Sequence, residues 1–380
     1  MKIVLLPGDG IGPEVVAAGR LVLEAVADRF GHRLEIEECA IGGAAIDATG
    51  DPLPASTVAA CREADAILLG AVGGPRWDAP DARVRPEQGL LGIRRALGLF
   101  ANLRPVRPHP SVASASPLRA HVVDGVDLLV VRELTGGMYF GAKTLVSEGD
   151  GERAIDTCEY TTGEIERIAR VAGDLARSRR RRVTSVDKAN VLETSRLWRR
   201  TTARVMAEEF PDVRVEHALV DSCAMRLIQR PREFDVILTE NMFGDILTDE
   251  AAVLAGSIGV LPSASLGDAR PGGGRRPGLY EPIHGSAPDL AGTGTANPIG
   301  TIASVAMMFR HSLQLEPEAA AIDTAIRRTL DAGIVTPDLA ASRGDGVRGA
   351  VSTLEVARAV VARLSTTVAR DASCAIASTA

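Results

Sequence analysis

Short apolar runs alternate along this chain with longer stretches that carry apolar residues at helical spacing. The helical pattern is clear at residues 165–175, where Ile165, Ile168 and Ala172 share one face. The short runs are rich in leucine and β-branched residues, and we predict strands at residues 2–6, 66–69, 128–131, 182–186 and 236–239. This alternation is typical of an α/β protein.

Glycine and proline mark the ends of these elements. A helix is predicted to begin at Gly12 and Pro13, because proline favours the first helical position, and Gly31 is expected to end it. Between Ser263 and Pro277 the chain is rich in glycine, proline and arginine, which predicts a mobile surface loop. Residues 147–156 are polar and breaker-rich, so we expect an exposed arm there.

Composition excludes several classes of protein. The 380 residues, 46% hydrophobic and 24% charged, suffice for one large or two ordinary domains. A net charge of −6 with both signs scattered argues against nucleic acid or an anionic membrane as partner, and the arginine run at residues 177–182 is expected to be a solvated helix end. We expect neither a signal peptide nor a bilayer-spanning run, and five cysteines without a Cys-x-x-Cys pair predict reduced thiols in a cytoplasmic protein.

Lysine is rare in this chain. Of 43 basic residues only Lys2, Lys143 and Lys188 are lysines. Arginine stays protonated, whereas a desolvated lysine can lose its proton and act as a base. Lys188, between a predicted strand and a helix, is therefore the first candidate for chemistry. The alternative, that a few lysines persist by chance in an arginine-rich chain, stays open at this point.

The glycines after the first strand do not form a dinucleotide fingerprint. In Gly8-Asp9-Gly10-Ile11-Gly12 the next glycine of the fingerprint would fall at residue 13, which is Pro13. We therefore predict a tight strand-to-helix turn and no Rossmann fold.

Acidic residues suggest a metal site. In NMFGDILTDE at residues 241–250, Asp245 and Asp249 are four apart, so a helix places these like charges on one face. A divalent cation would remove their repulsion, and carboxylates suit Mg²⁺ or Mn²⁺. The plainer interpretation is a helix-start anion and a solvated residue. Asp221 is a third candidate, or alternatively the cap of a helix beginning at Ser222.

Arg94, Arg104 and Arg132 lie in segments of unusual composition. If they converge, three guanidinium groups would clamp a dicarboxylate through paired hydrogen bonds. Singly, each could be a surface residue. Tyr139 follows Arg132, and a phenol can deliver a proton if a neighbouring cation such as a lysine lowers its pKa. The alternative for Tyr139 is a half-buried aromatic with a satisfied hydroxyl.

A loop of glycine, proline and polar residues is a candidate for adenosine binding. It runs EPIHGSAPD at residues 281–289 and is followed by Asn297. His284 within it could equally be structural.

Together these motifs resemble one known family. The matching segments are LPGDGIGPE at residues 6–14, GGAAID at 42–47, residues 70–77, RPE at 85–87, FANLRP at 100–105, residues 132–141, DKANV at 187–191, residues 241–249 and residues 284–289. They cover nearly the whole chain and resemble the β-decarboxylating dehydrogenases, the isocitrate/isopropylmalate dehydrogenase family.

The resemblance implies a two-domain α/β fold of that family rather than a Rossmann fold. Residues 1–100 with 255–365 would form a cofactor-binding domain. Residues 101–254 would form a second domain for dimerisation and the metal and substrate site, with its arm near 145–160. Residues 366–380 are expected to be a frayed tail.

The resemblance also assigns roles. It implies a homodimer in which Lys188 and Asp221 reach into the other subunit's site. Asp221, Asp245 and Asp249 would hold Mg²⁺ or Mn²⁺, with Asp221 also contacting substrate. Arg94, Arg104 and Arg132 would clamp the malate carboxylates, and Tyr139 and Lys188 would move protons. The expected contacts for NAD are Glu87, Asn190, Glu281, His284, Gly285, Ser286, Ala287, Asp289 and Asn297.

The implied reaction is NAD-dependent, metal-dependent oxidative decarboxylation. Lys188 would take the C2 hydroxyl proton as hydride leaves, the metal would stabilise the enolate after CO₂ loss, and Tyr139 would protonate C3. Leu90, Leu91 and Val191 would form an apolar wall that disfavours isocitrate and homoisocitrate and accepts 3-isopropylmalate. Asp289 would accept a ribose 2′-hydroxyl, which favours NAD over NADP.

Two alternatives remain at this level. A related enzyme could use malate, tartrate or another 3-alkylmalate, because alkyl homologues differ by only about 1–3 kcal/mol per methylene. A catalytically silent homologue that acts as a binding partner would carry a very similar sequence.

Overall fold

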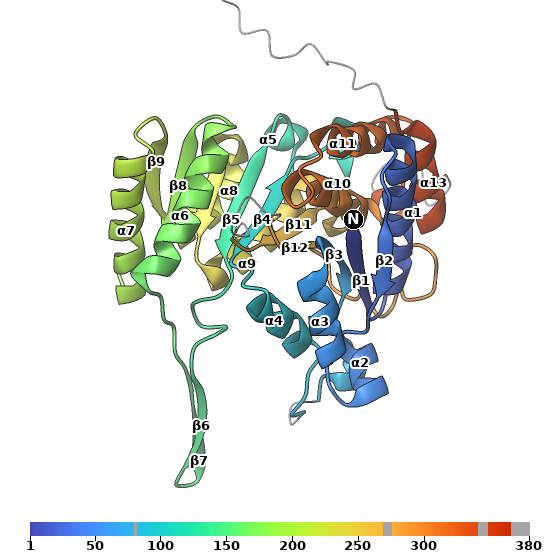
Figure 1. Cartoon of the computed structure of the whole chain (residues 1–380). Coiled ribbons are helices and arrows are strands. Elements are labelled where there is room, and N and C mark those ends of the chain that lie inside the picture. The colour runs from blue at the N-terminus through green and yellow to red at the C-terminus, as the bar shows by residue number, and fades with distance from the viewer. Residues whose placement is uncertain (80–81, 269–275, 341–348, 366–380) are drawn as a thin grey trace, which may run out of the picture.

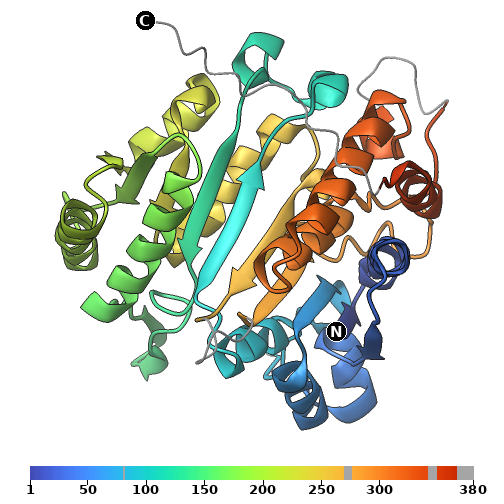
Figure 2. The same ribbon diagram turned by 45° about the horizontal axis from the view of Figure 1, so that its top comes forward.

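A ten-stranded mixed sheet crosses the molecule and is covered by helices on both faces (Figures 1 and 2). The computed structural model describes residues 1–79, 82–268, 276–340 and 349–365. Within them the strand order is β2-β1-β3-β12-β11-β4-β5-β10-β8-β9. The strands are β1 (Lys2–Gly8), β2 (Glu35–Glu38), β3 (Ala66–Ala71), β4 (Ala101–Val106), β5 (Leu128–Glu133), β8 (Arg182–Asp187), β9 (Arg214–Leu219), β10 (Val236–Thr239), β11 (Pro262–Leu266) and β12 (Gly278–Pro282).

The middle of the sheet is antiparallel and its two sides are parallel. Strand β4 runs antiparallel to β5 and to β11, and β11 runs antiparallel to β12. The remaining neighbours pair in parallel. The predicted boundary between two domains falls between β11 and β4, which pair directly; the division into domains stays a prediction.

Helices divide between the two faces of the sheet. One face carries α1 (Gly12–Phe30), α6 (Thr162–Arg177), α7 (Glu193–Glu209), α10 (Ile299–His311), α11 (Glu316–Asp331), α12 (Pro337–Ala340) and α13 (Thr353–Arg363). The other carries α2 (Gly42–Thr49), α3 (Ala55–Glu63), α4 (Glu87–Ala96), α5 (Ala120–Val123), α8 (Val220–Gln229) and α9 (Asn241–Ala255).

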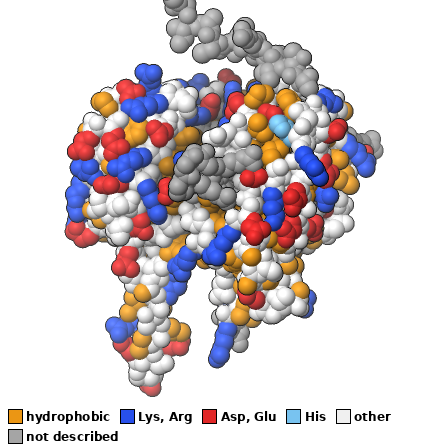
Figure 3. Space-filling view, viewed as in Figure 1, with side chains coloured by type: hydrophobic (Ala, Val, Ile, Leu, Met, Phe, Trp, Pro, Cys, Tyr) orange, Lys and Arg blue, Asp and Glu red, His pale blue; other side chains and the backbone are white. Residues whose placement is uncertain are grey.

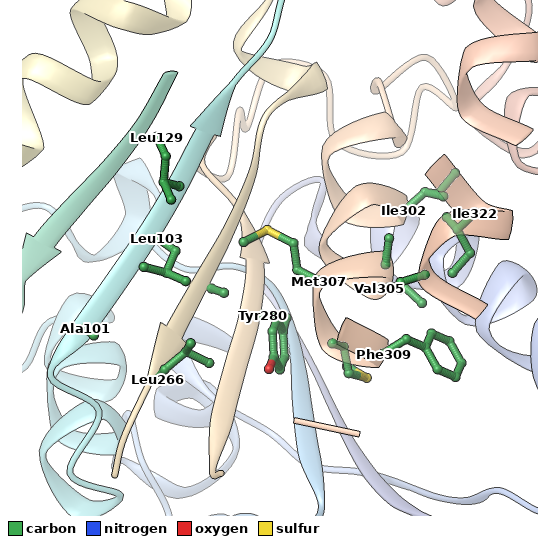
Figure 4. Packing of buried hydrophobic residues seen from close by; sticks show 14 of the residues in the cluster. Ala101, Leu103, Leu129, Leu266, Tyr280, Ile302, Val305, Met307, Phe309 and Ile322 are labelled. Atoms are coloured by element: carbon green, nitrogen blue, oxygen red, sulfur yellow. The ribbon is translucent and has the colours of Figure 1, made fainter. Parts of the chain in front are cut away.

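Alternation along each strand explains why both faces are covered. In β10, Val236 and Leu238 belong to the core beneath α6 and α10, whereas Ile237 belongs to the core beneath α8 and α9. Successive side chains of a strand point to opposite faces, so an uninterrupted apolar run needs cover on both. Figure 4 shows part of the first core, where the side chain of Met307 from α10 reaches over the strands that carry Leu266 and Tyr280. Each such buried leucine contributes roughly 1.5–3 kcal/mol.

The five predicted strands and the first helix are confirmed. Helix α1 begins at Gly12 with Pro13 in its first turn, and Gly31 ends it with φ of 76°. The predicted loop from Ser263 is wrong at its start, because residues 263–266 belong to the buried strand β11. The hydroxyl groups of Ser263 and Ser265 accept hydrogen bonds there from a buried asparagine, which is described below. Residues 269–275 and the predicted tail at 366–380 lie outside the described residues.

The predicted arm is a two-stranded hairpin that leaves the body of the protein (Figures 1 and 3). It consists of β6 (Lys143–Glu148) and β7 (Gly151–Asp156), and every residue of both strands is exposed. Its apolar side chains include Leu145, 67% exposed, and Ile155, 43% exposed. The arm therefore ends before residue 160, since Tyr160 is buried in the core against Trp198.

The arginine run after α6 is not simply solvated. Arg179 donates to the buried Asp235 at 2.9 Å and to Asp127 at 2.7 Å, and Arg177 pairs with Asp212. These three carboxylates offset part of the positive charge of the five arginines. The four described cysteines are free, and no described helix is long and apolar enough to cross a membrane.

Candidate active site

Helix α9 carries Asp245 and Asp249, and a buried carboxylate determines where this helix begins. Glu240 follows strand β10 and accepts hydrogen bonds from the backbone N–H groups of Phe243 (2.6 Å) and Met242 (3.2 Å). These bonds satisfy the free donors of the first turn. Asp245 thus lies one turn into the helix and is not a helix-start anion. Arg104 lies 3.7 Å from Asp245 and 3.7 Å from Asp249, so the prediction of one shared face is confirmed.

Asp245 is held from two sides. The Arg132 guanidinium donates to its Oδ1, and the Tyr139 hydroxyl donates to its Oδ2 at 2.8 Å. Burial opposes ionisation of Asp245, but the charges of Arg132 and Arg104 outweigh it and lower its pKa. Burial and the nearby Asp245 carboxylate raise the pKa of Asp249, against the opposing charge of Arg104. Two carboxylates that repel each other are a donor set that a divalent cation would stabilise.

The three predicted arginines converge. Arg94, Arg104 and Arg132 are 7%, 8% and 2% exposed, so none is a surface residue. Burial and the neighbouring charge of Arg132 lower the pKa of Arg104 to about 10, and burial and Arg94 also lower the pKa of Arg132. Arg94 donates to Glu281 at 2.7 Å. Because these cations repel one another, the cluster favours an anionic ligand.

Two asparagines orient these arginines, and our sequence analysis did not identify them. Asn102 accepts from Arg104 Nε at 2.9 Å and donates to Ser263 at 2.8 Å. Asn241 accepts from Arg132 Nη2 at 2.7 Å and donates to two main-chain carbonyls. Asn102 and Arg104 are two residues apart in one strand, so period-two spacing was the signal that could have paired them.

The pKa of Tyr139 differs from the prediction. Burial and the hydrogen bond to Asp245 raise it to about 12, because ionisation would place a phenolate beside a carboxylate. The hydroxyl therefore keeps its proton at neutral pH. The lysine that lies close by is Lys143, whose Nζ donates to the main-chain carbonyls of Met138 and Tyr139 at 3.0 and 2.9 Å. Lys143 therefore contacts the backbone of this segment and not the Tyr139 hydroxyl.

Lys188 and Asp221 form a separate pair, 2.6 Å apart. Lys188 follows β8, where its backbone N–H donates to Ser195, and Asp221 lies in the first turn of α8. Helix α8 begins at Val220 after Leu219, so Asp221 is not the helix cap. The hydrogen bond from Lys188 lowers the pKa of Asp221. The side chains are 30% and 60% exposed, which leaves the pair open to solvent or to another chain.

Within one chain, the Lys188–Asp221 pair and the Asp245–Asp249 pair do not form a single metal site. Among the described residues, no three acidic, histidine or cysteine side chains are placed to hold a metal together. The expected third carboxylate is Asp221 of the partner subunit, and that assignment stays a prediction. A second chain that supplies Lys188 and Asp221 would complete the set.

The predicted adenosine loop is held close to the first turn of the chain. Ser286 accepts a hydrogen bond from the backbone N–H of Ile11 at 2.8 Å, and Asn297 donates to Asp338 at 2.9 Å. His284 shares a 2.9 Å contact with the Gly285 carbonyl, while its buried Nε2 has no partner in the described structure. Burial lowers the pKa of His284, so the ring is neutral at pH 7. An unsatisfied ring nitrogen fits a loop that binds a polar ligand.

The remaining predicted contacts lie partly in this loop and partly on other elements. Gly285 and Asp289 are exposed, Ala287 is half-buried with a φ of 37°, and Glu281 is engaged by Arg94. Other exposed residues are Glu87 at the start of α4 and Asn190 beside Lys188. Leu90 and Leu91 are half-buried on α4, whereas Val191 is 60% exposed next to Asn190. The apolar wall of these three residues stays a prediction.

Comparisons with known proteins agree with these features. The sequence model of the isocitrate/isopropylmalate dehydrogenase family matches residues 2–360. A 3-isopropylmalate dehydrogenase from Rhodopirellula baltica is 61% identical over 96% of this chain and 99% of its own, and one from Anaeromyxobacter dehalogenans is 56% identical with the same coverage.

Solved structures are similar as well. An isocitrate dehydrogenase from Methylococcus capsulatus is 35% identical, with a TM-score of 0.82 over 95% of this chain and 98% of that one. A β-decarboxylating dehydrogenase from Thermococcus kodakarensis is 38% identical, with a TM-score of 0.74 over 95% of both chains.

The tyrosines provide a test of this geometry. Burial raises the pKa of Tyr160 and Tyr280 as well as that of Tyr139, so all three exceed the usual value of about 10. In a titration at 295 nm the native protein should show no tyrosinate at pH 10, whereas the urea-unfolded chain titrates there. Stability should fall as pH rises from 10 to 12, because the unfolded state then releases protons that the native state keeps. A native tyrosine that ionises near pH 10 would contradict the described contacts.

Proposed function

The chain belongs to the isocitrate/isopropylmalate dehydrogenase family, and from that premise we propose that it converts 3-isopropylmalate to 4-methyl-2-oxopentanoate and CO₂ in leucine biosynthesis. NAD⁺ would accept the hydride, Mg²⁺ or Mn²⁺ would assist, and the enzyme would act in the cytoplasm. The observation that carries this proposal is the buried cluster of three arginines beside Asp245, Asp249 and Tyr139. Identity of 61% to a 3-isopropylmalate dehydrogenase supports the substrate.

The arginine cluster suits a dicarboxylate. A malate skeleton brings two negative charges, which would offset the mutual repulsion of Arg94, Arg104 and Arg132. Asn102 and Asn241 hold two of these guanidinium groups in place before substrate arrives. Pre-set donors lose little side-chain entropy on binding, so they favour both affinity and orientation.

The carboxylates suit a divalent cation. Asp245 and Asp249 of one chain, with Asp221 of the partner subunit, would supply hard oxygen ligands. When bound, the ion would act as a Lewis acid for the charge that develops during decarboxylation. Arg132 and Tyr139 already contact Asp245, so they would orient its oxygens from the protein side.

Proton transfer falls to Lys188 and Tyr139. Lys188 of the partner subunit would take the C2 hydroxyl proton as the substrate is oxidised. Tyr139 would deliver a proton to C3 after CO₂ leaves, since its high pKa keeps the phenol protonated until then. Leu90, Leu91 and the partner's Val191 would exclude water from the isopropyl group.

The cofactor contacts favour NAD over NADP. The carboxylate of Asp289 is exposed in the predicted loop, where it can accept a ribose hydroxyl and would repel a 2′-phosphate. Among the described residues the buried Nε2 of His284 has no partner, and because Nδ1 faces the Gly285 carbonyl, Nε2 can accept a hydrogen bond from the exocyclic amino group of adenine.

A homodimer explains three features of the chain. Helices α8 and α9 expose Met225 (62%) and Ile246 (60%), large apolar residues that a second chain would cover. The arm presents Leu145 to solvent, and an isolated two-stranded hairpin is at most marginally stable. Finally, Lys188 and Asp221 lie apart from the carboxylates that they would serve.

The first test is turnover by the purified protein. NADH formation with Mn²⁺ should be fastest with 3-isopropylmalate in a panel that also contains malate, tartrate, isocitrate and homoisocitrate. Chelation by EDTA should abolish the rate, and added Mn²⁺ should restore it. If kcat/KM on malate, tartrate or isocitrate equalled or exceeded that on 3-isopropylmalate, the proposed substrate would be wrong. If none of the compounds were turned over, the result would favour a catalytically silent homologue.

Replacement of Lys188 by arginine tests the base. Lys188→Arg keeps the charge but removes a group that can release a proton, so kcat should fall about 10²- to 10⁴-fold. The matched control is Lys2→Arg, because Lys2 pairs with Glu37 and Glu63 on the surface at β1. The control should keep wild-type kcat. Near wild-type kcat in Lys188→Arg would show that this lysine is not the base.

Mixed dimers test whether the site is shared. Lys188→Met and Asp245→Asn should each be inactive as homodimers. A dimer that contains one chain of each has one site with both native residues, so about half of the wild-type activity should return in a symmetric dimer. Differently tagged chains, co-expressed and purified through both tags, allow this measurement. A mixed dimer without activity would place both residues in the same chain's site.

A further inference from the structure

Asp9 is a buried carboxylate in the turn between β1 and α1, and the proposed reaction does not use it. It is 5% exposed, and among the described residues no cation pairs with it. Instead it accepts three backbone hydrogen bonds, from Gly43 (2.8 Å) and Gly73 (2.8 Å) to Oδ2 and from Ala44 (2.7 Å) to Oδ1. Burying a carboxylate costs several kcal/mol unless its oxygens are hydrogen-bonded, and these three donors compensate for the burial of Asp9.

The first two donors belong to the start of helix α2. Gly43 and Ala44 lie in its first turn, whose N–H groups have no partner within the helix. Asp9 therefore fills the positive end of α2 from a different segment. The approach is close, since a Cβ on Gly42 would lie 2.6 Å from Asp9 Oδ2. In a Rossmann fold the turn after the first strand binds a phosphate of the ligand. Here the turn after β1 instead carries the carboxylate of Asp9, which occupies a helix N-terminus.

The third donor links Asp9 to Glu87. Gly73 adopts φ of 108°, and a Cβ there would lie 2.8 Å from Glu87 Oε1. Gly73 is thus placed between the carboxylate of Asp9 and that of Glu87, the predicted nicotinamide contact. A shift of the turn at Gly73 would therefore change the space beside the Glu87 carboxylate.

The same turn also holds the adenosine loop. The backbone N–H of Ile11 donates to the Ser286 carbonyl at 2.8 Å, and a Cβ on Gly10 would lie 2.0 Å from that oxygen. Glu14, in the first turn of α1, accepts from the backbone of Gly294 (3.2 Å) and Ala296 (3.1 Å). The turn at Asp9 therefore contacts the adenosine loop directly and, through Gly73, reaches the segment beside Glu87.

We propose that Asp9 is a positioning residue for the dinucleotide: it fixes the distance between Glu87 at the nicotinamide end and the loop of Ser286 at the adenosine end. This inference rests on the proposed function, because it concerns the cofactor of that reaction. Asp9 touches neither substrate nor cofactor and acts through the main chain of Gly73 and α2.

Asp9→Asn tests the role with the least change in volume. An amide has one acceptor oxygen, so its NH₂ group would face an N–H donor and at least one of the three bonds is lost. NADH affinity, followed by fluorescence without substrate, should weaken about tenfold, or about 1.4 kcal/mol. KM for NAD⁺ should rise by a similar factor, while KM for 3-isopropylmalate changes less than about twofold.

Asp235→Asn is the matched control. Asp235 is 1% exposed and also accepts a backbone hydrogen bond, from Arg182 at 3.1 Å. Unlike Asp9 it is also paired with Arg179, and it precedes β10, away from the turn. This variant should lower Tm and leave NADH affinity unchanged. If both variants weaken NADH binding equally, or if Asp9→Asn binds NADH as tightly as wild type, the positioning role is wrong.

Gly73→Ala provides the same test should Asp9→Asn fail to fold. A side chain at Gly73 is strained by its φ of 108°, and the added methyl group would meet the end of the Glu87 side chain. The turn should therefore shift and NADH affinity should fall, and unchanged affinity would overturn the proposal. The proposed function can be judged apart from it. A wild-type protein that binds no NADH overturns both, whereas a wild type that binds NADH and turns over 3-isopropylmalate leaves only the role of Asp9 in question.

Discussion

The burial of three guanidinium groups in one place is the constraint on which the rest of the site depends. Arg94, Arg104 and Arg132 are almost completely removed from water, and each needs a fixed acceptor. Glu281 from β12, Asn102 from β4, and Asn241 with Asp245 from α9 supply these acceptors. Because the strands that meet there are the antiparallel ones, the change of strand direction in mid-sheet brings cations and acceptors together. A charge left without its partner would cost about 3–5 kcal/mol, so this arrangement tolerates little displacement.

Acidic side chains hold the loops around this cluster by accepting main-chain hydrogen bonds. Glu240 sets the start of α9, Asp9 fills the start of α2, and Glu14 holds residues 294 and 296. In each case a carboxylate meets N–H groups that have no partner within their own helix or loop. Such bonds are short and directional, so they place the flanking side chains more narrowly than apolar packing does.

One chain contains both sets of residues expected for catalysis, but they lie in separate places. The carboxylates of α9 lie with the arginines, while Lys188 and Asp221 form a pair of their own that is partly open. In the proposed homodimer, the exposed apolar residues of α8, α9 and the arm would be covered by the second copy. Assembly and catalysis would then depend on each other, because the same contact that covers these residues would bring the lysine to its site.

The sequence by itself determined the strands, the first helix and most of the candidate residues. Strand runs such as residues 236–239 are uniformly apolar, and the spacing of Asp245 and Asp249 requires one helical face, so local rules suffice there. Only the tertiary structure decided that Ser263 lies in a buried strand, that the pKa of Tyr139 is raised, and that Asn102 and Asp9 serve residues distant in sequence. The physical reason is the same in each case. Burial, charge and hydrogen-bond partners come from segments that meet only when the sheet forms, and no local pattern records them.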